Sequence, residues 1–202
     1  MSGALPRLPA HAAGMRIGLF GGSFNPPHGG HRHASLVAMK RLRLDRVWWL
    51  VTPGNPLKRN DGLPPLPQRL AAAAVSARHP RISVTGIEAA IGTRYTFDTL
   101  LWLTRHCPGV RFVWIMGADN LAGFHRWQLW REIAALMPIA IVDRPQATLR
   151  AAGGKAALAL ARWRLDEADA GQLASRRPPA FVFLHGPRSA LSSTRLRAPA
   201  RN

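Results

Sequence analysis

The chain has 202 residues, of which 47% are hydrophobic, and it carries 28 lysines and arginines against 10 aspartates and glutamates, a formal net charge of +18. This length suffices for one buried core, and no apolar run approaches the roughly 18 residues of a membrane-spanning helix, which argues against a membrane protein. Cys107 is the only cysteine, which excludes an intrachain disulfide and fits a reducing compartment. We therefore expect a soluble, cytoplasmic protein.

Short apolar runs alternate with helix-like stretches along most of the chain. The first 14 residues lack the continuous apolar segment of a secretory signal, and we expect a flexible extension at 1–14 before a single domain at 15–202. In chain order, the expected elements of that domain are strand 15–20, helix 30–42, strand 46–51, helix 68–78, strand 82–85, helix 96–106, strand 111–117, helix 127–136, strand 139–142, part of a helix at 156–163 and strand 181–184. Apolar strands that alternate with helices are typical of a parallel sheet covered on both faces. The sequence thus predicts an α/β fold, a Rossmann-like doubly wound parallel sheet with helices on both faces.

Four loops that directly follow predicted strands have unusual compositions. The four segments are FGGSFNPPHGGH, TPGNPLK, GADN and HGPRSALSSTRLR. In a doubly wound sheet, ligands bind beyond the carboxyl ends of the strands, at the point where the strand order reverses. We therefore expect the chemistry to gather at one edge of the sheet.

The segment FGGSFNPPHGGH has the features of a phosphate-binding loop. Gly21 and Gly22 follow the first strand, where the lack of a side chain lets backbone N–H groups approach a phosphate. His28 and His31 are three residues apart and share one face of the first helical turn, beside the positive end of the helix dipole. Two imidazoles there can hydrogen-bond the oxygens of a phosphate whose charge grows during displacement. The spacing therefore indicates stabilisation of a transition state at phosphorus.

Other interpretations stay open at this point. The histidines could instead cap the helix or bind a metal, but a zinc site needs further ligands, and the sequence has neither HExxH nor clustered cysteines. Neither GxGxxG nor GxxxxGK[ST] is present, which argues against a dinucleotide bound in the usual Rossmann manner. Arginine accounts for 25 of the 28 basic residues. Such a charge attracts nucleic acid or a phosphorylated small molecule, or it reflects arginines scattered over solvated surfaces.

The segment GGSFNPPHGGH resembles the signature of the bacterial nicotinate-nucleotide adenylyltransferases. These are members of a nucleotidyltransferase superfamily whose shared mark is HxGH, present here at residues 28–31. The resemblance extends over nearly all of the chain from Met15 onward. Its further elements are GNPLK, RYTFDTL, GADN, Trp127, DRP at 143–145, and LSSTRLR, which is similar to the ISSTxxR element of the superfamily.

The resemblance implies the HxGH nucleotidyltransferase fold and the transfer of AMP from ATP to nicotinic acid mononucleotide, giving deamido-NAD and pyrophosphate. It also implies Mg²⁺ that arrives with ATP and is held mainly by the substrate phosphates, so we expect no protein metal ligand. The implied catalytic residues are His28 and His31. The implied ATP-binding residues are these two histidines with Gly21, Gly22, Ser23, Phe24, Ser192, Ser193, Thr194 and Arg197. The implied acceptor-binding residues are Asn55, Lys58, Tyr95, Thr96, Gly117, Asp119 and Trp127.

Several of these residues suit particular parts of the two substrates. Trp127 resembles the stacking tryptophan of the family, and Thr96 with neighbouring N–H groups would meet the pyridine carboxylate. Asp119 suits the ribose hydroxyls and Lys58 suits the phosphate of the mononucleotide. Hydroxyl and amide groups of the segment 192–197 would face the β- and γ-phosphates of ATP.

Two alternative functions remain. An adenylyltransferase of the same superfamily acting on nicotinamide mononucleotide or phosphopantetheine would use the same phosphate chemistry, but SFNPPH, TFDT and GADN favour the nicotinate enzyme. A nucleic-acid-binding protein would fit the charge, but RNP-like aromatic residues, finger spacing and dense basic stretches are missing. We therefore expect ATP and nicotinic acid mononucleotide as partners, with no nucleic acid and no membrane, while the sequence leaves the oligomeric state undetermined.

Overall fold

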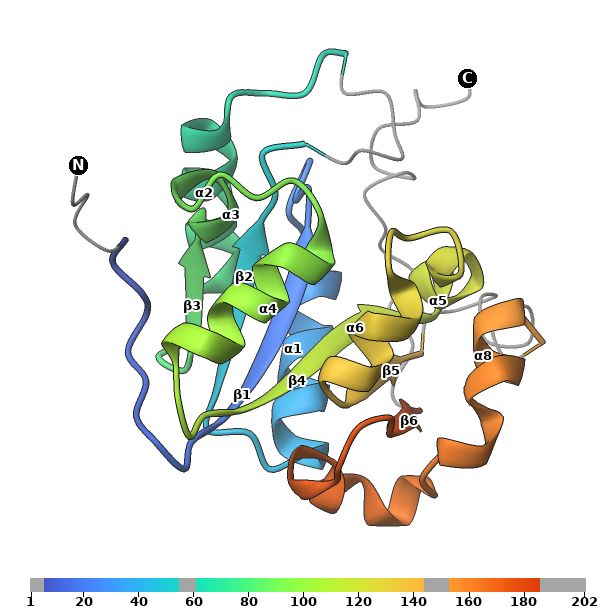
Figure 1. Ribbon diagram of the computed structural model, residues 1–202. Coiled ribbons are helices and arrows are strands. Elements are labelled where there is room, and N and C mark those ends of the chain that lie inside the picture. Colours follow the sequence, from blue (N-terminus) through green and yellow to red (C-terminus); the bar gives the residue numbers. More distant parts are fainter. Residues whose placement is uncertain (1–5, 55–60, 144–152, 186–202) are drawn as a thin grey trace.

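The computed structural model describes residues 6–54, 61–143 and 153–185 of the chain (Figure 1). Strands in these parts form one six-stranded sheet in which every neighbouring pair runs parallel. The strands are β1 (Arg16–Gly22), β2 (Arg46–Val51), β3 (Ile82–Thr85), β4 (Arg111–Gly117), β5 (Ile139–Val142) and β6 (Phe181–Leu184). Their order is β3-β2-β1-β4-β5-β6, so the direction of winding reverses between β1 and β4. The predicted doubly wound parallel sheet is confirmed.

Helices connect the strands and lie on both faces of the sheet (Figure 1). They are α1 (Gly29–Arg41), α2 (Leu66–Ala77), α3 (Ile87–Ala90), α4 (Thr96–His106), α5 (Ala118–Phe124), α6 (Trp130–Leu136), α8 (Lys155–Leu160) and the 3₁₀ helices η1 (Ala161–Trp163) and η2 (Glu167–Ser175). Five strands and one helix have the bounds that the sequence predicts, namely 46–51, 82–85, 111–117, 139–142, 181–184 and 96–106.

The sequence does not predict α3, α5 and η2. The first two have four and seven residues, which is too short for the repeated apolar spacing by which a helix is recognised. The third is a 3₁₀ helix, whose repeat of three residues differs from the α-helical period. The helix predicted at 127–136 begins only at Trp130, because Leu129 takes a left-handed conformation with φ 52° that an α-helix cannot include.

Two apolar clusters fill the two sides of the sheet. In β2, Trp48 and Leu50 belong to one cluster and Val47, Trp49 and Val51 to the other, because successive side chains of a strand point to opposite faces. Helices α4 and α6 cover the front of the sheet in Figure 1, and α1 lies behind it. Both neighbouring tryptophans are therefore fully buried, one on each side.

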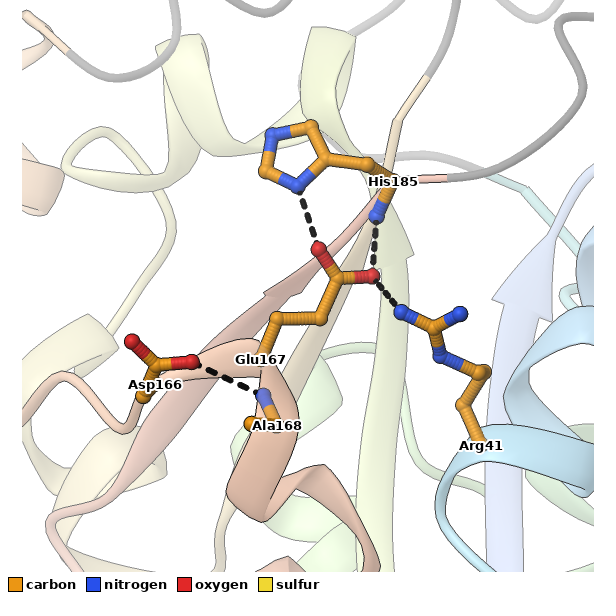
Figure 2. Close-up of polar contacts among 5 residues, drawn as sticks. All are labelled: Arg41, Asp166, Glu167, Ala168 and His185. Atoms are coloured by element: carbon orange, nitrogen blue, oxygen red, sulfur yellow. Dashed lines mark hydrogen bonds and ion pairs between the residues drawn. The ribbon is translucent and has the colours of Figure 1, made fainter.

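The end of β6 is tied to two helices through one carboxylate, as Figure 2 shows. Glu167 in the first turn of η2 accepts hydrogen bonds from the backbone N–H and ring Nδ1 of His185, at 2.9 and 2.7 Å, and pairs with Arg41 at the end of α1. Asp166 caps the same 3₁₀ helix by accepting from Ala168 N at 2.8 Å. These contacts are partly exposed, so each is expected to stabilise the fold by about 1 kcal/mol or less.

Residues 6–14 contain neither helix nor strand and lie against the domain. Leu8 packs on the apolar cluster that contains Trp48, and the ring of His11 meets that of Trp48 edge to face, with centroids 5.8 Å apart. Gly14 N donates to Gly109 O at 2.8 Å. Within the parts of the chain that the structure describes, no helix combines the length and apolarity needed to cross a bilayer.

Candidate active site

The loop after β1 lies where the strand order reverses, and two features fix its path. At Gly21, a Cβ atom would come within 2.5 Å of the Trp114 ring, so only glycine allows β4 to bring its indole this close. Phe24 has a left-handed φ of 46°, is 2% exposed, and stacks on Trp49 with ring centroids 4.8 Å apart. The Phe24 side chain therefore anchors the loop in the core, and only its backbone can face a ligand.

Both histidines of the predicted pair take part in the cap of α1. His28 is the N-cap residue, and its Nδ1 accepts a hydrogen bond from Gly30 N at 3.1 Å. His31 Nδ1 in turn accepts from His28 N at 3.2 Å, which completes a capping box made by two imidazoles. Because each Nδ1 is an acceptor, the proton of each neutral ring lies on Nε2. Capping and ligand binding thus use different nitrogens and do not exclude each other.

The two imidazoles are held tightly in position. The ring centroids are 3.9 Å apart, and the residues His28 and His31 are 6% and 8% exposed, respectively. The ring of His31 also packs on that of Phe24 at 4.9 Å. One turn later, Ser35 donates to His31 O at 2.9 Å and accepts from Trp49 Nε1 at 2.8 Å. Donors fixed in this way need little reorganisation when charge develops nearby.

A cavity of about 340 Å³ opens beside the same loop. Its wall combines bare backbone from the end of β1, aromatic rings and the start of α4, which is a suitable lining for a planar polar ligand. The lining residues are Gly21, Gly22, Ser23, Thr52, Glu88, Arg94, Tyr95, Thr96, Trp114, Asn120, Arg126, Trp127 and Gln128.

Glu88 of α3 is the buried acid of this cavity. The residue is 7% exposed, and burial raises the pKa of its carboxyl group to about 7. The carboxyl group is therefore about half protonated near neutral pH. A carboxyl group with a raised pKa in a cavity is a candidate functional group.

Comparison with known proteins fits this geometry. Residues 19–199 match the family model described as cytidylyltransferase-like. A probable nicotinate-nucleotide adenylyltransferase of Methylorubrum extorquens is 62% identical over 183 residues, which cover 91% of this chain and 99% of that protein. A probable nicotinate-nucleotide adenylyltransferase of a Bradyrhizobium species is 63% identical over 185 residues, which cover 92% of this chain and 96% of that protein. The chain belongs to the nicotinate-nucleotide adenylyltransferase family.

Solved structures of members of this family share the fold. The Plasmodium falciparum nicotinic acid mononucleotide adenylyltransferase complexed with NaAD has a TM-score of 0.62 at 16% identity, covering 91% of this chain and 82% of that chain. A putative nicotinate-nucleotide adenylyltransferase from Vibrio parahaemolyticus has a TM-score of 0.54 at 20% identity, covering 66% of this chain and 77% of that chain. At these identities the likeness supports the architecture alone.

Six of the residues predicted for this adenylyltransferase site lie together around the cavity. Those that line the cavity are Gly21, Gly22, Ser23, Tyr95, Thr96 and Trp127. The ring of Trp127 meets Phe124 edge to face at 5.4 Å, which fixes its plane. Gly117 ends β4, is the N-cap residue of α5 and is buried. Asp119 is exposed in the first turn of α5, and the next residue, Asn120, lines the cavity.

The other predicted residues lie outside the described parts of the chain. They are Asn55, Lys58, Ser192, Ser193, Thr194 and Arg197. Their roles stay predictions that rest on the resemblance of GNPLK and LSSTRLR to the family.

Several cavity residues have no signal in the sequence. Glu88 lies in a helix too short to predict, and Thr52 is one of several polar residues after β2. Arg94 and Arg126 are exposed and add positive charge to the rim. Trp114 is 2% exposed and belongs to the core, yet it also lines the cavity. Only knowledge of the strand order places these residues beside one another.

No group of three or more His, Cys, Asp or Glu side chains that could hold a metal ion occurs in residues 6–54, 61–143 and 153–185.

Proposed function

We propose that this protein transfers AMP from ATP to nicotinic acid mononucleotide, giving deamido-NAD and pyrophosphate. The observation that carries the proposal is the imidazole pair of His28 and His31, which caps α1 through Nδ1 and so keeps both Nε2 nitrogens as donors. The relatives at 62% and 63% identity, whose names state the nicotinate nucleotide, support the choice of acceptor.

The reaction needs no protein nucleophile. A phosphate oxygen of the mononucleotide attacks the α-phosphorus of ATP, a new P–O bond forms, and the bond from that phosphorus to the bridging oxygen of pyrophosphate breaks. Negative charge accumulates on the oxygens of the α-phosphoryl group as the bonds exchange. The Nε2–H groups of His28 and His31, aided by the N-terminal end of α1, stabilise that charge.

The remaining parts of ATP are assigned to the loop and to the C-terminal segment. Backbone N–H groups of Gly21, Gly22, Ser23 and Phe24 approach the nucleotide, a role that suits glycines and a side chain turned into the core. The β- and γ-phosphates are assigned to Ser192, Ser193, Thr194 and Arg197. Mg²⁺ enters with ATP and neutralises the pyrophosphate portion, held by the substrate phosphates.

The acceptor is assigned to the cavity beside the loop. Trp127 stacks on the pyridine ring, and Thr96 with the N–H groups at the start of α4 binds the carboxylate, close to Tyr95. Gly117 and Asp119 follow β4 and take the ribose side, and Asn55 and Lys58 take the phosphate of the mononucleotide. The positive rim of Arg94 and Arg126 favours the entry of an anion.

A competition of acceptors tests this proposal. Purified protein with Mg-ATP is supplied in turn with nicotinic acid mononucleotide, nicotinamide mononucleotide and phosphopantetheine, and pyrophosphate release is measured against ATP alone. We expect kcat/KM to be highest with nicotinic acid mononucleotide, because the cavity pairs an aromatic face with donors for a carboxylate. A wide preference for nicotinamide mononucleotide would contradict the acceptor, and no release with any acceptor would contradict the activity.

A further inference from the structure

Arg69 is a buried arginine whose guanidinium is bound by main-chain oxygens. The residue lies in the first turn of α2 and is 3% exposed. Its Nε donates to Pro64 O at 2.8 Å, its Nη1 to Ser23 O at 3.0 Å and Thr52 O at 2.7 Å, and its Nη2 to Pro53 O at 3.0 Å. Because the residue is buried, desolvation lowers the pKa of Arg69 from its ordinary value.

The four oxygens belong to three different segments of the site. Ser23 lies in the loop after β1, Thr52 and Pro53 lie in the loop after β2, and Pro64 lies in the segment that leads into α2. The first two loops are also joined directly, because Thr52 N donates to Gly22 O at 3.0 Å. One side chain thus ties together the carboxyl ends of two neighbouring strands.

Only arginine can make this set of contacts. Its planar guanidinium offers five N–H donors in a fixed fork, whereas lysine has a single nitrogen and methionine has no donor. Burying a guanidinium is costly, and the four carbonyl oxygens offset that cost by accepting its hydrogen bonds. Because all four acceptors lie in loops of the site or in the segment before α2, the side chain acts on the conformation of those loops.

The contact with Ser23 acts directly on the nucleotide loop. In a trans peptide the C=O of one residue and the N–H of the next point in opposite directions. Holding Ser23 O toward α2 therefore turns the N–H of Phe24 to the opposite side, at the residue whose left-handed φ of 46° shapes the loop. The contact with Thr52 acts on the cavity, because Thr52 lines it together with Glu88.

We propose that Arg69 is a positioning residue for phosphoryl transfer, which holds the loops after β1 and β2 in their ATP-binding conformation before ATP arrives. The inference rests on the proposed function, since it assigns the loop at Ser23 to ATP. Arg69 itself touches no substrate and acts through the main chain. Preformed loops of this kind lower the entropy cost of binding and fix the reacting groups.

Two variants separate positioning from stability. Arg69→Lys retains the charge and Arg69→Met retains the apolar stem, and neither can hold the four carbonyl oxygens. Arg78→Met, at the exposed end of the same helix, is the matched control. Thermal unfolding is measured first, and the affinity for a nonhydrolysable Mg-ATP analogue is then measured by calorimetry well below each midpoint.

We expect both Arg69 variants to bind the analogue at least about tenfold more weakly while folded, and the control to bind it as the wild type does. Hydrogen exchange of the Thr52 amide should be at least about tenfold faster in the Arg69 variants, with the Trp114 amide in β4 unchanged. A folded variant with wild-type affinity overturns the proposal, and so does failure of both variants to fold. Analogue binding needs no acceptor, so a failed acceptor assay would leave this result intact.

Discussion

Replacing His28 with alanine is expected to lower kcat by about 100-fold to 1000-fold, whereas the affinity for ATP should fall by only about threefold or less. The interaction of His28 Nε2 with the α-phosphoryl group strengthens mainly while phosphorus is attacked, so its loss appears in turnover. Steady-state kinetics gives kcat, and binding of a nonhydrolysable ATP analogue to the same preparation gives the affinity. Equal losses of turnover and affinity would contradict a role in the transition state.

The cap made by His28 calls for a second variant. Alanine removes the acceptor for Gly30 N and is expected to destabilise the protein by about 1 kcal/mol. Asparagine is a favoured N-cap residue, so His28→Asn should preserve the thermal midpoint while its short side chain cannot reach as far as the imidazole. We expect this variant to be folded and as impaired in kcat as His28→Ala. Recovery of wild-type turnover by His28→Asn would mean that the histidine acts as a cap alone.

The stability of the protein should fall as pH rises toward neutrality because of Glu88. Burial raises the pKa of this carboxyl from 4.5 to about 7, so between these values the folded protein keeps a proton that the unfolded chain releases. The contribution of Glu88 is therefore fully present below about pH 4.5 and is lost as pH rises through about 7, with a total change of up to about 3 kcal/mol. Urea unfolding at several pH values across this range measures how the free energy of unfolding changes with pH.

A neutral isostere isolates this contribution. Glu88→Gln cannot ionise, so its free energy of unfolding relative to wild type should rise between about pH 4.5 and about pH 8 and stay level above that. Glu132→Gln, an exposed acid on α6, is the matched control and should show no such change. A constant difference between wild type and Glu88→Gln across the whole range would mean that the buried carboxyl titrates as an ordinary glutamate.

The sheet could be predicted because its strands are buried on both sides. RVWWLV and RFVWIMG are continuous apolar runs, and β2 and β4 begin and end where those runs do. From residue chemistry alone, candidate site residues could be predicted only where they are close in sequence, as His28 and His31 are, whereas Tyr95, Thr96 and Trp127 are predicted from the family resemblance. Arg69 is one of 25 arginines and looks like any solvated residue of a helix, because its partners are carbonyl oxygens that every sequence possesses. The sequence does not single out Glu88 either, because its raised pKa comes from burial in the folded protein.

From the sequence, helix capping by the two histidines could be predicted only as an alternative to catalysis. The structure shows that the capping box uses Nδ1 of each ring, which sets the tautomer of the neutral imidazole. The helix start thus orients the very groups that the proposed chemistry needs. The same arrangement can therefore cap the helix and serve the phosphate-binding role that we propose.

The most direct measurement is the structure of this protein with Mg²⁺ and a nonhydrolysable ATP analogue. We expect Nε2 of both His28 and His31 to lie about 3 Å from oxygens of the phosphate chain, with the α-phosphoryl group between the imidazoles and the loop at Gly22. Rings turned away from the triphosphate, or a triphosphate bound elsewhere on the protein, would contradict the account.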